Sequence, residues 1–328
     1  MDEFETIARV FRPLAARTPE ALGLADDAAV YTPPAGRDLV VTTDLLVAGV
    51  HFRPDDAPDA IARKAVGVNV SDLSAMGATA AGFTLALALP DDLAAGWLER
   101  FAAGLAVEQS NMSIRLWGGD LSRTPGPLTL SVTAIGHVPA GRAVRRSTAA
   151  VGDEVWVSGT VGDGALGLAV LQGRLAALPR ARRQDLVTRY HVPPSRVELA
   201  PFLPDMATAA IDLSDGLLAD LGHVAEESAV AATVALDLVP RSVAVRAALA
   251  LEPDLLDLSL TGGDDYELLF TVPAGTDVEA LTPGRLCRVT RIGAITAGSG
   301  VTICDQAGRP LVFERQGWRH SWPAGTAR

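Results

Sequence analysis

Six aspartates in this sequence interrupt apolar runs or stand near glycine, serine or threonine, where a carboxylate needs a partner. They are Asp27, Asp44, Asp72, Asp120, Asp212 and Asp215. An ionised carboxylate that leaves water is destabilising unless a cation or several hydrogen bonds compensate for the lost hydration. No His or Cys cluster accompanies these acids. A metal held by them would therefore have only oxygen ligands, which favours Mg²⁺ or Mn²⁺ over zinc or copper.

Such a set of acids suits phosphoryl transfer better than acyl transfer. Several carboxylates could hold several ions, and these could bridge nucleotide phosphates in a chain that has no Walker loop. The sequence shows no Ser-His-Asp order, and His51 is the only histidine close to the acids.

Asp44 follows the apolar run 39–41, which is rich in β-branched residues and predicts a buried strand. We expect this strand to present Thr42, Thr43 and Asp44 at its carboxyl end, where α/β folds keep their chemistry. An N-capping Asp in a strand-end loop is the simpler alternative.

Asp72 lies on the apolar stripe of a helix expected over residues 59–76, in line with Ile61, Ala65 and Val68. A metal shared with Asp44 would compensate for its burial, and so would hydrogen bonds from backbone N–H groups.

The other acids have simpler readings as well. The Asp26–Asp27 pair can be a solvated acidic turn, and Asp120 is expected at the end of a strand over 114–117. Ser214 and Asp215 have the residue types of an N-cap and a first helical turn, whereas Asp212 interrupts the preceding apolar run. The glycine-rich turn 159–164 can cradle a phosphate with its N–H groups, although it matches no established phosphate-binding motif.

Strands and helices alternate through both halves of the chain, which predicts an α/β fold with mixed sheets. Further expected helices cover 4–17, 91–109 and 165–189, and a short strand turns into another helix within 209–218. Further expected strands cover 83–89, 128–138, 154–158, 288–295 and 301–304, and the stretch 261–272 ends in a buried strand. We place a domain boundary in the arginine-rich linker 141–147, giving a domain over 1–140 and another over 141–328. This linker is either plain surface or a segment that reaches a triphosphate.

Composition narrows the class of partner. With 39 acidic residues against 28 Lys and Arg, the net charge is −11, and no basic run is present. These features argue against nucleic acid and membranes as partners. The N-terminus MDEFETIARVF does not resemble a signal peptide, so we expect a cytoplasmic protein.

Read in order, six motifs of this chain resemble the thiamine-monophosphate kinase family. They are DDAAV, TTDLLVAGVHF, KAVGVNVSDLSAMGA, GGDLS, AIDLSDGLLADLGH and TGGDDYELLFT. The resemblance implies the two-domain fold of the superfamily that includes aminoimidazole ribonucleotide synthetase and selenophosphate synthetase. It also implies a homodimer whose N-terminal domains form a barrel. The implied reaction is ATP plus thiamine monophosphate giving ADP plus thiamine diphosphate, with Mg²⁺ as cofactor and no dedicated catalytic base.

The resemblance assigns three groups of residues. The Mg²⁺ ligands would be Asp27, Thr42, Thr43, Asp44, Asp72, Asp120, Asp212 and Asp215. ATP would contact Gly119, Asp120, Arg146 and Ser214. Thiamine monophosphate would contact His51, Asp264 and Trp318.

The chain departs from the family pattern at two positions, with Ala25 where Gly is usual and Asp264 where Glu is usual. Two alternatives remain at this point. One is a sibling ATP-using enzyme, although the cysteines at 287 and 304 do not match the terminal cysteines of two siblings. The other is a non-catalytic homologue that binds Mg-nucleotide without substrate-dependent ADP release.

Overall fold

The computed structural model describes residues 3–282 and 287–318. The chain divides into two compact units, and neither follows a single stretch of sequence. Unit 1 comprises Met1–Val144, His191–Met206 and Ala280–Cys287, and unit 2 comprises Arg145–Tyr190, Ala207–Glu279 and Arg288–Arg328.

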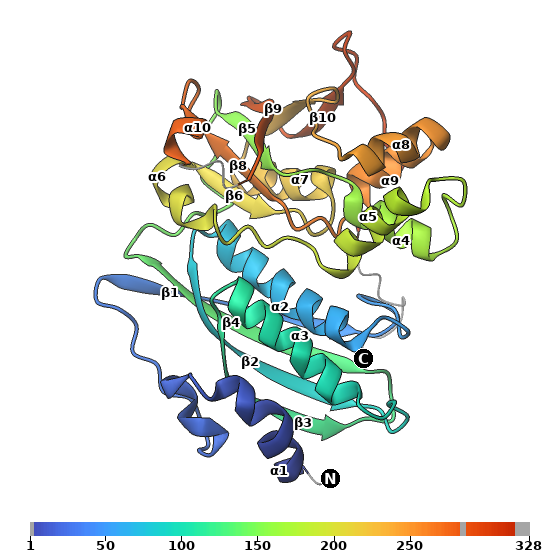
Figure 1. Cartoon of the computed structure of the whole chain (residues 1–328). Helices are drawn as coiled ribbons and strands as arrows, with labels where there is room; N and C mark the ends of the chain where they lie inside the picture. The colour runs from blue at the N-terminus through green and yellow to red at the C-terminus, as the bar shows by residue number, and fades with distance from the viewer. Residues whose placement is uncertain (1–2, 283–286, 319–328) are drawn as a thin grey trace, which may run out of the picture. The chain divides into compact units, whose positions relative to one another are not determined.

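Unit 1 holds a four-stranded sheet and the helices that pack on it (Figure 1). Its strands are β1 (Arg37–Val47), β2 (Thr79–Leu89), β3 (Arg115–Arg123) and β4 (Thr129–Pro139). Its helical segments are α1 (Glu3–Thr6), η1 (Ile7–Phe11), η2 (Arg12–Ala15), η3 (Pro19–Leu24), α2 (Pro58–Ala75), α3 (Trp97–Asn111), η4 (Ala200–Phe202) and α6 (Leu203–Met206).

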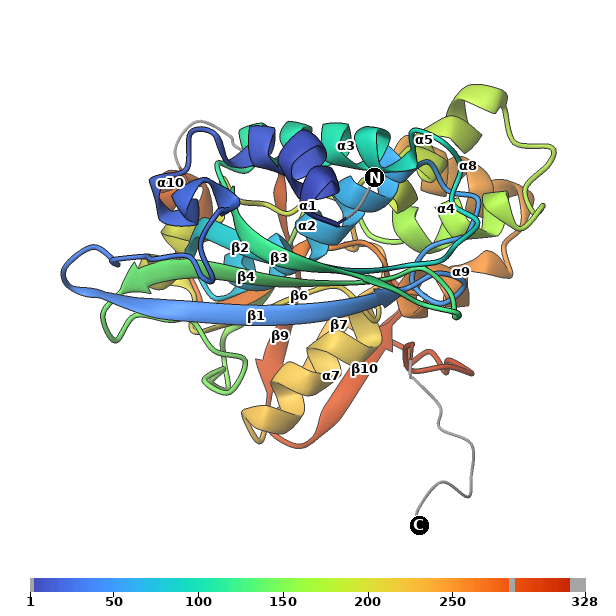
Figure 2. The same ribbon diagram turned by 90° about the horizontal axis from the view of Figure 1, so that it is seen from below.

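The strands of this sheet lie in the order β1-β4-β2-β3, and only the β2–β3 pair is parallel. Helix α2 packs on the sheet, mainly against β4 and β1, and α3 packs on α2. Figure 2 shows both helices on the same side of the sheet. The opposite face of the sheet is not covered by these helices.

Strand β1 therefore has one covered and one open face, and its residues alternate between them. Val40 and Leu46 are buried, whereas Leu39, Val41 and Leu45 are 50–60% exposed. The prediction of a buried strand that ends before Asp44 is therefore wrong. The ladder continues through Asp44, which lies opposite Val132 of β4.

The prediction that Asp120 ends its strand is wrong for the same reason. Strand β3 continues through Gly118 and Gly119, and Asp120 lies opposite Ala86 of β2. Both acids sit within long strands of a one-sided sheet, where polar and apolar residues can alternate without ending the strand.

Unit 2 is built on a six-stranded mixed sheet with the order β10-β7-β9-β5-β8-β6. Its strands are β5 (Glu154–Ser158), β6 (Ala209–Asp212), β7 (Ala231–Ala235), β8 (Leu268–Val272), β9 (Val289–Thr296) and β10 (Gly300–Cys304). Its helices include α4 (Asp163–Leu171), α5 (Arg180–His191), α7 (Leu217–Glu227), α8 (Val243–Leu251) and α9 (Leu255–Thr261), and the residues of α10 (Val278–Leu281) are divided between the two units. Apolar residues of α7 join those of the sheet in one buried cluster.

Most predicted elements are confirmed, with differences at their ends. The helix expected over 59–76 is α2, and the strand expected over 154–158 is β5. The helix expected over 4–17 is a succession of short α, π and 3₁₀ turns. The helix expected over 165–189 is two helices, α4 and α5, and β7 is not among the predicted strands.

Within the described residues, no helix combines the length and the apolar character needed to cross a membrane.

Candidate active site

The alternation of β1 turns Thr42 and Asp44 toward helix α2. The Thr42 hydroxyl donates a hydrogen bond of 2.6 Å to Asp72 Oδ2. The backbone N–H of Asp44 donates one of 3.1 Å to Asn69 Oδ1. Asn69 is fully buried, and its amide nitrogen donates to the Ala65 carbonyl at 2.9 Å. Thr42 and Asp72, two predicted metal ligands, are thus hydrogen-bonded to each other. Asp44, a third, is held by Asn69, which lies on the same helix as Asp72.

Asp72 is close enough to Asp44 to affect its ionisation. Burial, and secondarily the negative charge of Asp72, raise the pKa of Asp44 to about 6. Each effect disfavours the ionised carboxylate. A site that destabilises one of two neighbouring carboxylates is one where a bound cation would be stabilising.

Thr43 lies on the other face of β1. Its hydroxyl donates to the Val132 carbonyl at 3.1 Å and accepts from the Thr133 hydroxyl at 3.1 Å. The structure therefore brings Thr42, Asp44 and Asp72 together and does not bring the side chain of Thr43 to them.

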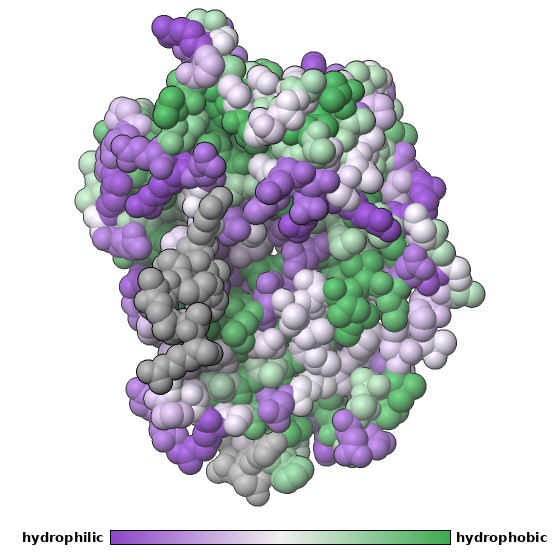
Figure 3. Space-filling model, turned by 180° about the vertical axis from the view of Figure 1, so that it is seen from behind, coloured by the Kyte–Doolittle hydropathy of each residue, from purple (hydrophilic) through white to green (hydrophobic). Residues whose placement is uncertain are grey.

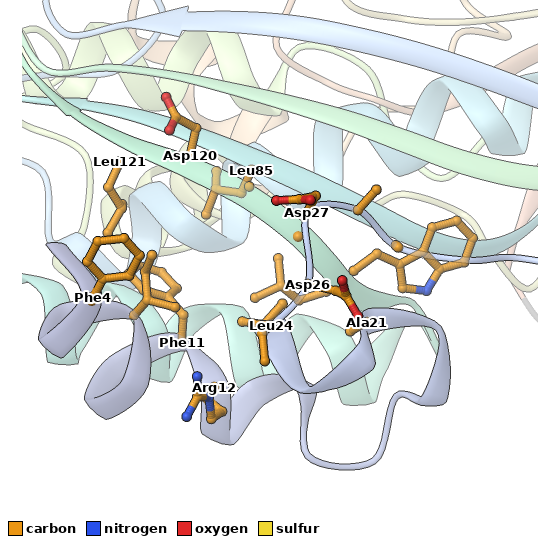
Figure 4. Close-up of a pocket in the computed structure, with 18 residues that line it drawn as sticks. Phe4, Phe11, Arg12, Ala21, Leu24, Asp26, Asp27, Leu85, Asp120 and Leu121 are labelled. Carbon is orange, nitrogen blue, oxygen red and sulfur yellow. The ribbon is translucent and has the colours of Figure 1, made fainter.

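A pocket of about 420 Å³ in unit 1 contains three further predicted residues, Asp27, Gly119 and Asp120. Figure 4 shows the carboxylates of Asp27 and Asp120 on two neighbouring segments, with the apolar side chains of Phe4 and Phe11 elsewhere in the pocket wall. The pocket thus combines acids and a glycine backbone with an apolar wall.

His51 lies in the turn that leaves β1. Its Nδ1 accepts a hydrogen bond of 3.0 Å from the backbone N–H of Val47, so the Nε2 edge of the ring is the one turned away from this strand. The following loop is fixed by Asp56, which accepts from the Arg53 N–H at 2.8 Å and bonds His191 at 2.9 Å.

In unit 2, Asp212 is the last residue of β6, and Ser214 and Asp215 lie between β6 and α7. Helix α7 begins at Leu217 with Gly216 at its N-cap and without a side-chain cap bond. The simpler reading of Ser214 as the N-cap is therefore wrong, and its hydroxyl is not committed to that role.

Asp220 is the residue that holds this turn. Its Oδ2 accepts hydrogen bonds from the N–H groups of Asp215 at 3.1 Å and Gly216 at 3.0 Å. Burial raises the pKa of Asp220 well above its ordinary value, and the charges of Asp212 and Asp215 raise it further. The sequence analysis did not single out Asp220 or Asn69. The signals for them were that Asn69 shares a helix with Asp72 and that Asp220 follows Asp215 closely in the chain.

Trp318 and Asp264, both predicted to contact the substrate, are hydrogen-bonded to the turn between β6 and α7. The backbone N–H of Trp318 donates to the Asp215 carbonyl at 3.0 Å, and its side chain is 51% exposed. The backbone N–H of Asp264 donates to the Ser214 carbonyl at 2.9 Å. Arg146, also in unit 2, is exposed, and its carbonyl accepts from the Ser228 hydroxyl at 3.0 Å.

The glycine-rich turn 159–164 is not an open phosphate cradle. The Asp265 carboxylate accepts the N–H groups of Gly162 at 2.7 Å and Gly164 at 3.0 Å. An internal carboxylate thus already uses the donors that a phosphate would need.

The predicted metal ligands are divided between the units. Asp212 and Asp215 lie in unit 2. The others lie in unit 1, namely Asp27, Thr42, Thr43, Asp44, Asp72 and Asp120. Among the residues that the structure describes, no group of three or more His, Cys, Asp or Glu side chains is arranged to hold a metal ion.

Comparisons with known proteins agree with this fold. Residues 25–138 match the family model of the AIR synthase related protein N-terminal domain, and residues 150–305 match that of its C-terminal domain. The chain is 41% identical over 323 residues to the thiamine-monophosphate kinase of Salmonella typhimurium, across 97% of this chain and 98% of that protein.

Solved structures give the same result. The thiamine-monophosphate kinase from Stenotrophomonas maltophilia has a TM-score of 0.84 and 43% identity, over 95% of this chain and 98% of that chain. AaThiL complexed with AMPPCP and TMP has a TM-score of 0.78 and 30% identity, over 98% of this chain and 99% of that chain. These similarities extend over nearly the whole of each protein and confirm the resemblance seen in the motifs. The chain belongs to the thiamine-monophosphate kinase family and has its two-domain α/β fold.

Proposed function

We propose that this protein transfers the γ-phosphoryl group of ATP to thiamine monophosphate, giving ADP and thiamine diphosphate. The observation that carries the proposal is the pair of neighbouring carboxylates Asp44 and Asp72, with the Thr42 hydroxyl bonded to Asp72, in a chain with whole-length similarity to kinases of this substrate.

The transfer forms one bond and breaks another. An oxygen of the substrate phosphate attacks the γ-phosphorus in line, and the bond to the β,γ-bridging oxygen breaks to release ADP. The attacking oxygen is already anionic near neutral pH, so no side chain has to remove a proton from it. The protein's main tasks are to bring two anionic groups together and to orient them.

We propose Mg²⁺ as the cofactor, with several ions bound. The donors fit this ion, because they are carboxylate and hydroxyl oxygens and because a cation would offset the burial of Asp44 and the charge of Asp72 beside it. The ligands would be Asp27, Thr42, Asp44, Asp72, Asp120, Asp212 and Asp215. The hydroxyl of Thr43 lies on the other face of β1, so we do not propose it as a ligand. Mg²⁺ bound there would offset the repulsion between the two phosphate groups.

For ATP, we propose contacts with Gly119, Asp120, Arg146 and Ser214. Support for nucleotide binding comes from AaThiL, which was solved with the ATP analogue AMPPCP. The pocket around Gly119 and Asp120 offers apolar wall beside its acids, and the exposed Arg146 has the guanidinium group that suits a phosphate.

For thiamine monophosphate, we propose contacts with His51, Asp264 and Trp318. The half-exposed indole of Trp318 offers an aromatic face on which a cationic ring can stack. Asp264 has a shorter side chain than the usual Glu, so a bridging water is a reasonable route for its contact.

We also propose that the protein is a homodimer that pairs through the open face of the unit 1 sheet. Three large apolar side chains of β1, Leu39, Val41 and Leu45, are exposed on that face. Contiguous exposed apolar surface commonly marks an interaction site. Figure 3 views the molecule from this side, where apolar residues lie between polar ones.

We also propose a cytoplasmic location, because the co-substrate is ATP. The boundary between the two functional domains is proposed to lie near residue 141.

The test is direct. Purified protein is mixed with Mg-ATP and thiamine monophosphate, with free thiamine as a parallel acceptor and a chelator as the metal-free control. We expect thiamine diphosphate from the monophosphate alone and none with the chelator. ATP binding without phosphorylation of either acceptor would point instead to a sibling substrate or to a non-catalytic protein.

A further inference from the structure

Three segments of unit 2 are bound to one another around Asp264. The segment 262–268 runs beside the turn 212–216, because the Asp264 N–H donates to the Ser214 carbonyl at 2.9 Å and the Tyr266 N–H donates to the Leu213 carbonyl at 2.8 Å. The Leu213 N–H returns a bond to the Glu267 carbonyl at 2.9 Å. One side of the Asp264 segment is thus fixed by backbone hydrogen bonds.

The other side is fixed by two buried acids that the proposed reaction does not use. Asp265 is 4% exposed, and its two carboxylate oxygens accept the N–H groups of Gly162 and Gly164. Glu267 is fully buried and accepts from the Ser158 hydroxyl at 2.6 Å and from Arg189 Nη2 at 2.6 Å. The turn 159–164 is therefore bound to the segment that carries Asp264.

The backbone between these supports is strained. Asp264 has φ +64° and Tyr266 has φ +51°, in the left-handed region that non-glycine residues seldom adopt. Such residues persist where the surroundings over-determine them. The turn 159–164 also lies very close to the Asp264 backbone, since a Cβ added to Gly164 would lie 2.1 Å from the Asp264 carbonyl oxygen. The bonds from Gly162 and Gly164 to Asp265 hold this close approach in place.

We propose that Asp265 is a positioning residue for substrate binding, which holds the turn 159–164 against Asp264 and so fixes the Asp264 carboxylate for its contact with thiamine monophosphate. This inference rests on the proposed function and on the Asp264 contact within it. Asp265 touches neither substrate nor nucleotide in this role. Its removal should therefore weaken binding of thiamine monophosphate and leave binding of ATP alone.

The variant Asp265→Asn tests this role. An amide can accept only one of the two N–H groups and turns its own N–H groups toward the other, so one bond is replaced by a repulsive contact. We expect KM for thiamine monophosphate to rise about tenfold, with KM for ATP unchanged, since small misplacements of a binding group are costly. Asp153→Asn is the matched control. Asp153 is also buried in unit 2 and accepts the Ala150 N–H at 2.9 Å, but it does not bond the Asp264 segment.

A double-mutant cycle with Asp264→Ala separates positioning from general destabilisation. If Asp265 acts through Asp264, then Asp265→Asn should raise KM for thiamine monophosphate in the wild-type background and have no further effect in the Asp264→Ala background. Equal effects in both backgrounds, an unchanged KM in Asp265→Asn, or an unchanged KM in Asp264→Ala would each overturn the inference.

A measurement on the wild-type protein covers the case in which Asp265→Asn does not fold. Hydrogen exchange of the Gly162 and Gly164 amides should slow when thiamine monophosphate binds and not when ATP alone binds. No change with thiamine monophosphate would contradict the inference. Turnover of the wild type is measured first, so that a failure of the proposed function shows as an inactive wild type and is distinguished from a failure of this inference.

Discussion

The side-chain oxygen of Asn69 accepts a hydrogen bond of 3.1 Å from the backbone N–H of Asp44, and so helix α2 holds the strand residue beside Asp72. Strand β1 is at the edge of its sheet, where every second N–H lacks a partner in the ladder. Asn69 supplies that partner and fixes the position of Asp44 at the same time.

Asn69→Ala should therefore weaken metal binding more than folding. We expect the Mg²⁺ concentration for half-maximal rate to rise about tenfold, as is typical when a residue that orients a metal ligand is removed. The measurement is a Mg²⁺ titration of turnover. Ser74→Ala is the matched control on α2, because the buried Ser74 hydroxyl bonds only its own helix, at the Val70 carbonyl, 2.8 Å away. Similar shifts in both variants would contradict a specific role for Asn69.

Asp72→Asn should nearly abolish turnover and leave the fold intact. The substitution keeps an acceptor for the Thr42 hydroxyl and removes one negative charge from the proposed metal site. We expect a loss on the order of a hundredfold or more in kcat, comparable to the removal of other electrostatic groups in active sites. Asp59→Asn, in the first turn of α2, is the control and should retain activity, because the Asp59 side chain is half-exposed and pairs with the exposed Arg100. Near-normal turnover in Asp72→Asn would reject the metal role.

The same variant makes a second, independent prediction about Asp44. Its pKa is raised to about 6 by burial first and by the Asp72 charge second. In Asp72→Asn the second effect is lost, so the pKa of Asp44 should fall toward its ordinary value without reaching it. An NMR titration of the Asp44 carboxyl carbon in metal-free protein measures this change. An unchanged pKa would mean that the two carboxylates do not interact.

Asp265 should make the stability of the protein depend on pH. Burial, and then the charge of Asp163, raise its pKa to about 8, against the opposing effects of the Gly162 and Gly164 N–H groups and of Arg189. In the unfolded chain the pKa is about 3.9. Between these values the folded state keeps a proton that the unfolded state has lost, so the contribution of Asp265 to stability falls as pH rises from about 4 to 8 and is constant above that.

Asp265→Asn removes this titration. The difference in free energy of unfolding between wild type and Asp265→Asn should therefore decrease from about pH 5 to about pH 8, as measured by urea denaturation. The difference between wild type and Asp153→Asn provides the comparison. A wild-type advantage over Asp265→Asn that is constant with pH would show that Asp265 is ionised throughout this range.

Val41→Lys should disrupt the proposed homodimer. Val41 is 60% exposed in the middle of β1, on the open face of the sheet, and a charge buried there on association would have no partner. We expect at least a tenfold weaker dimer by sedimentation or light scattering, as for a central interface residue. Val312→Lys, at a position that is 96% exposed and outside the strands of unit 1, should have no effect. A wild-type monomer would reject this proposal at once.

The sequence predicted the elements whose hydrophobic pattern is local. Helix α2 with Asp72 on its buried side and strand β5 follow from spacing within one segment. The ends of β1 and β3 do not, because a polar residue in a one-sided sheet does not stop the strand. Asp44 and Asp120 were for that reason expected at strand ends, although they lie within the ladder.

The site could be predicted only as a set of residue types. Strand alternation alone separates Thr42 and Asp44 from Thr43, but nothing in the sequence shows which of the two faces of β1 packs against α2. Nor can a sequence show that Asp265 occupies the N–H groups of Gly162 and Gly164, since these are about 100 residues away along the chain. The missing information is tertiary: which donor meets which acceptor across the fold.

Because the side chains of β1 alternate between its two faces, a single register fixes both the proposed metal ligands and the open face of the sheet. Its even-numbered residues turn toward α2 and carry Thr42 and Asp44, and its odd-numbered residues form the open face. Deletion or insertion of a single residue before Thr42 would exchange the two faces at once. Outside the proposed ligands, substitutions that keep the polarity of each face can be tolerated one at a time, but changes of length cannot, so over evolutionary time this strand should stay fixed in its residue count.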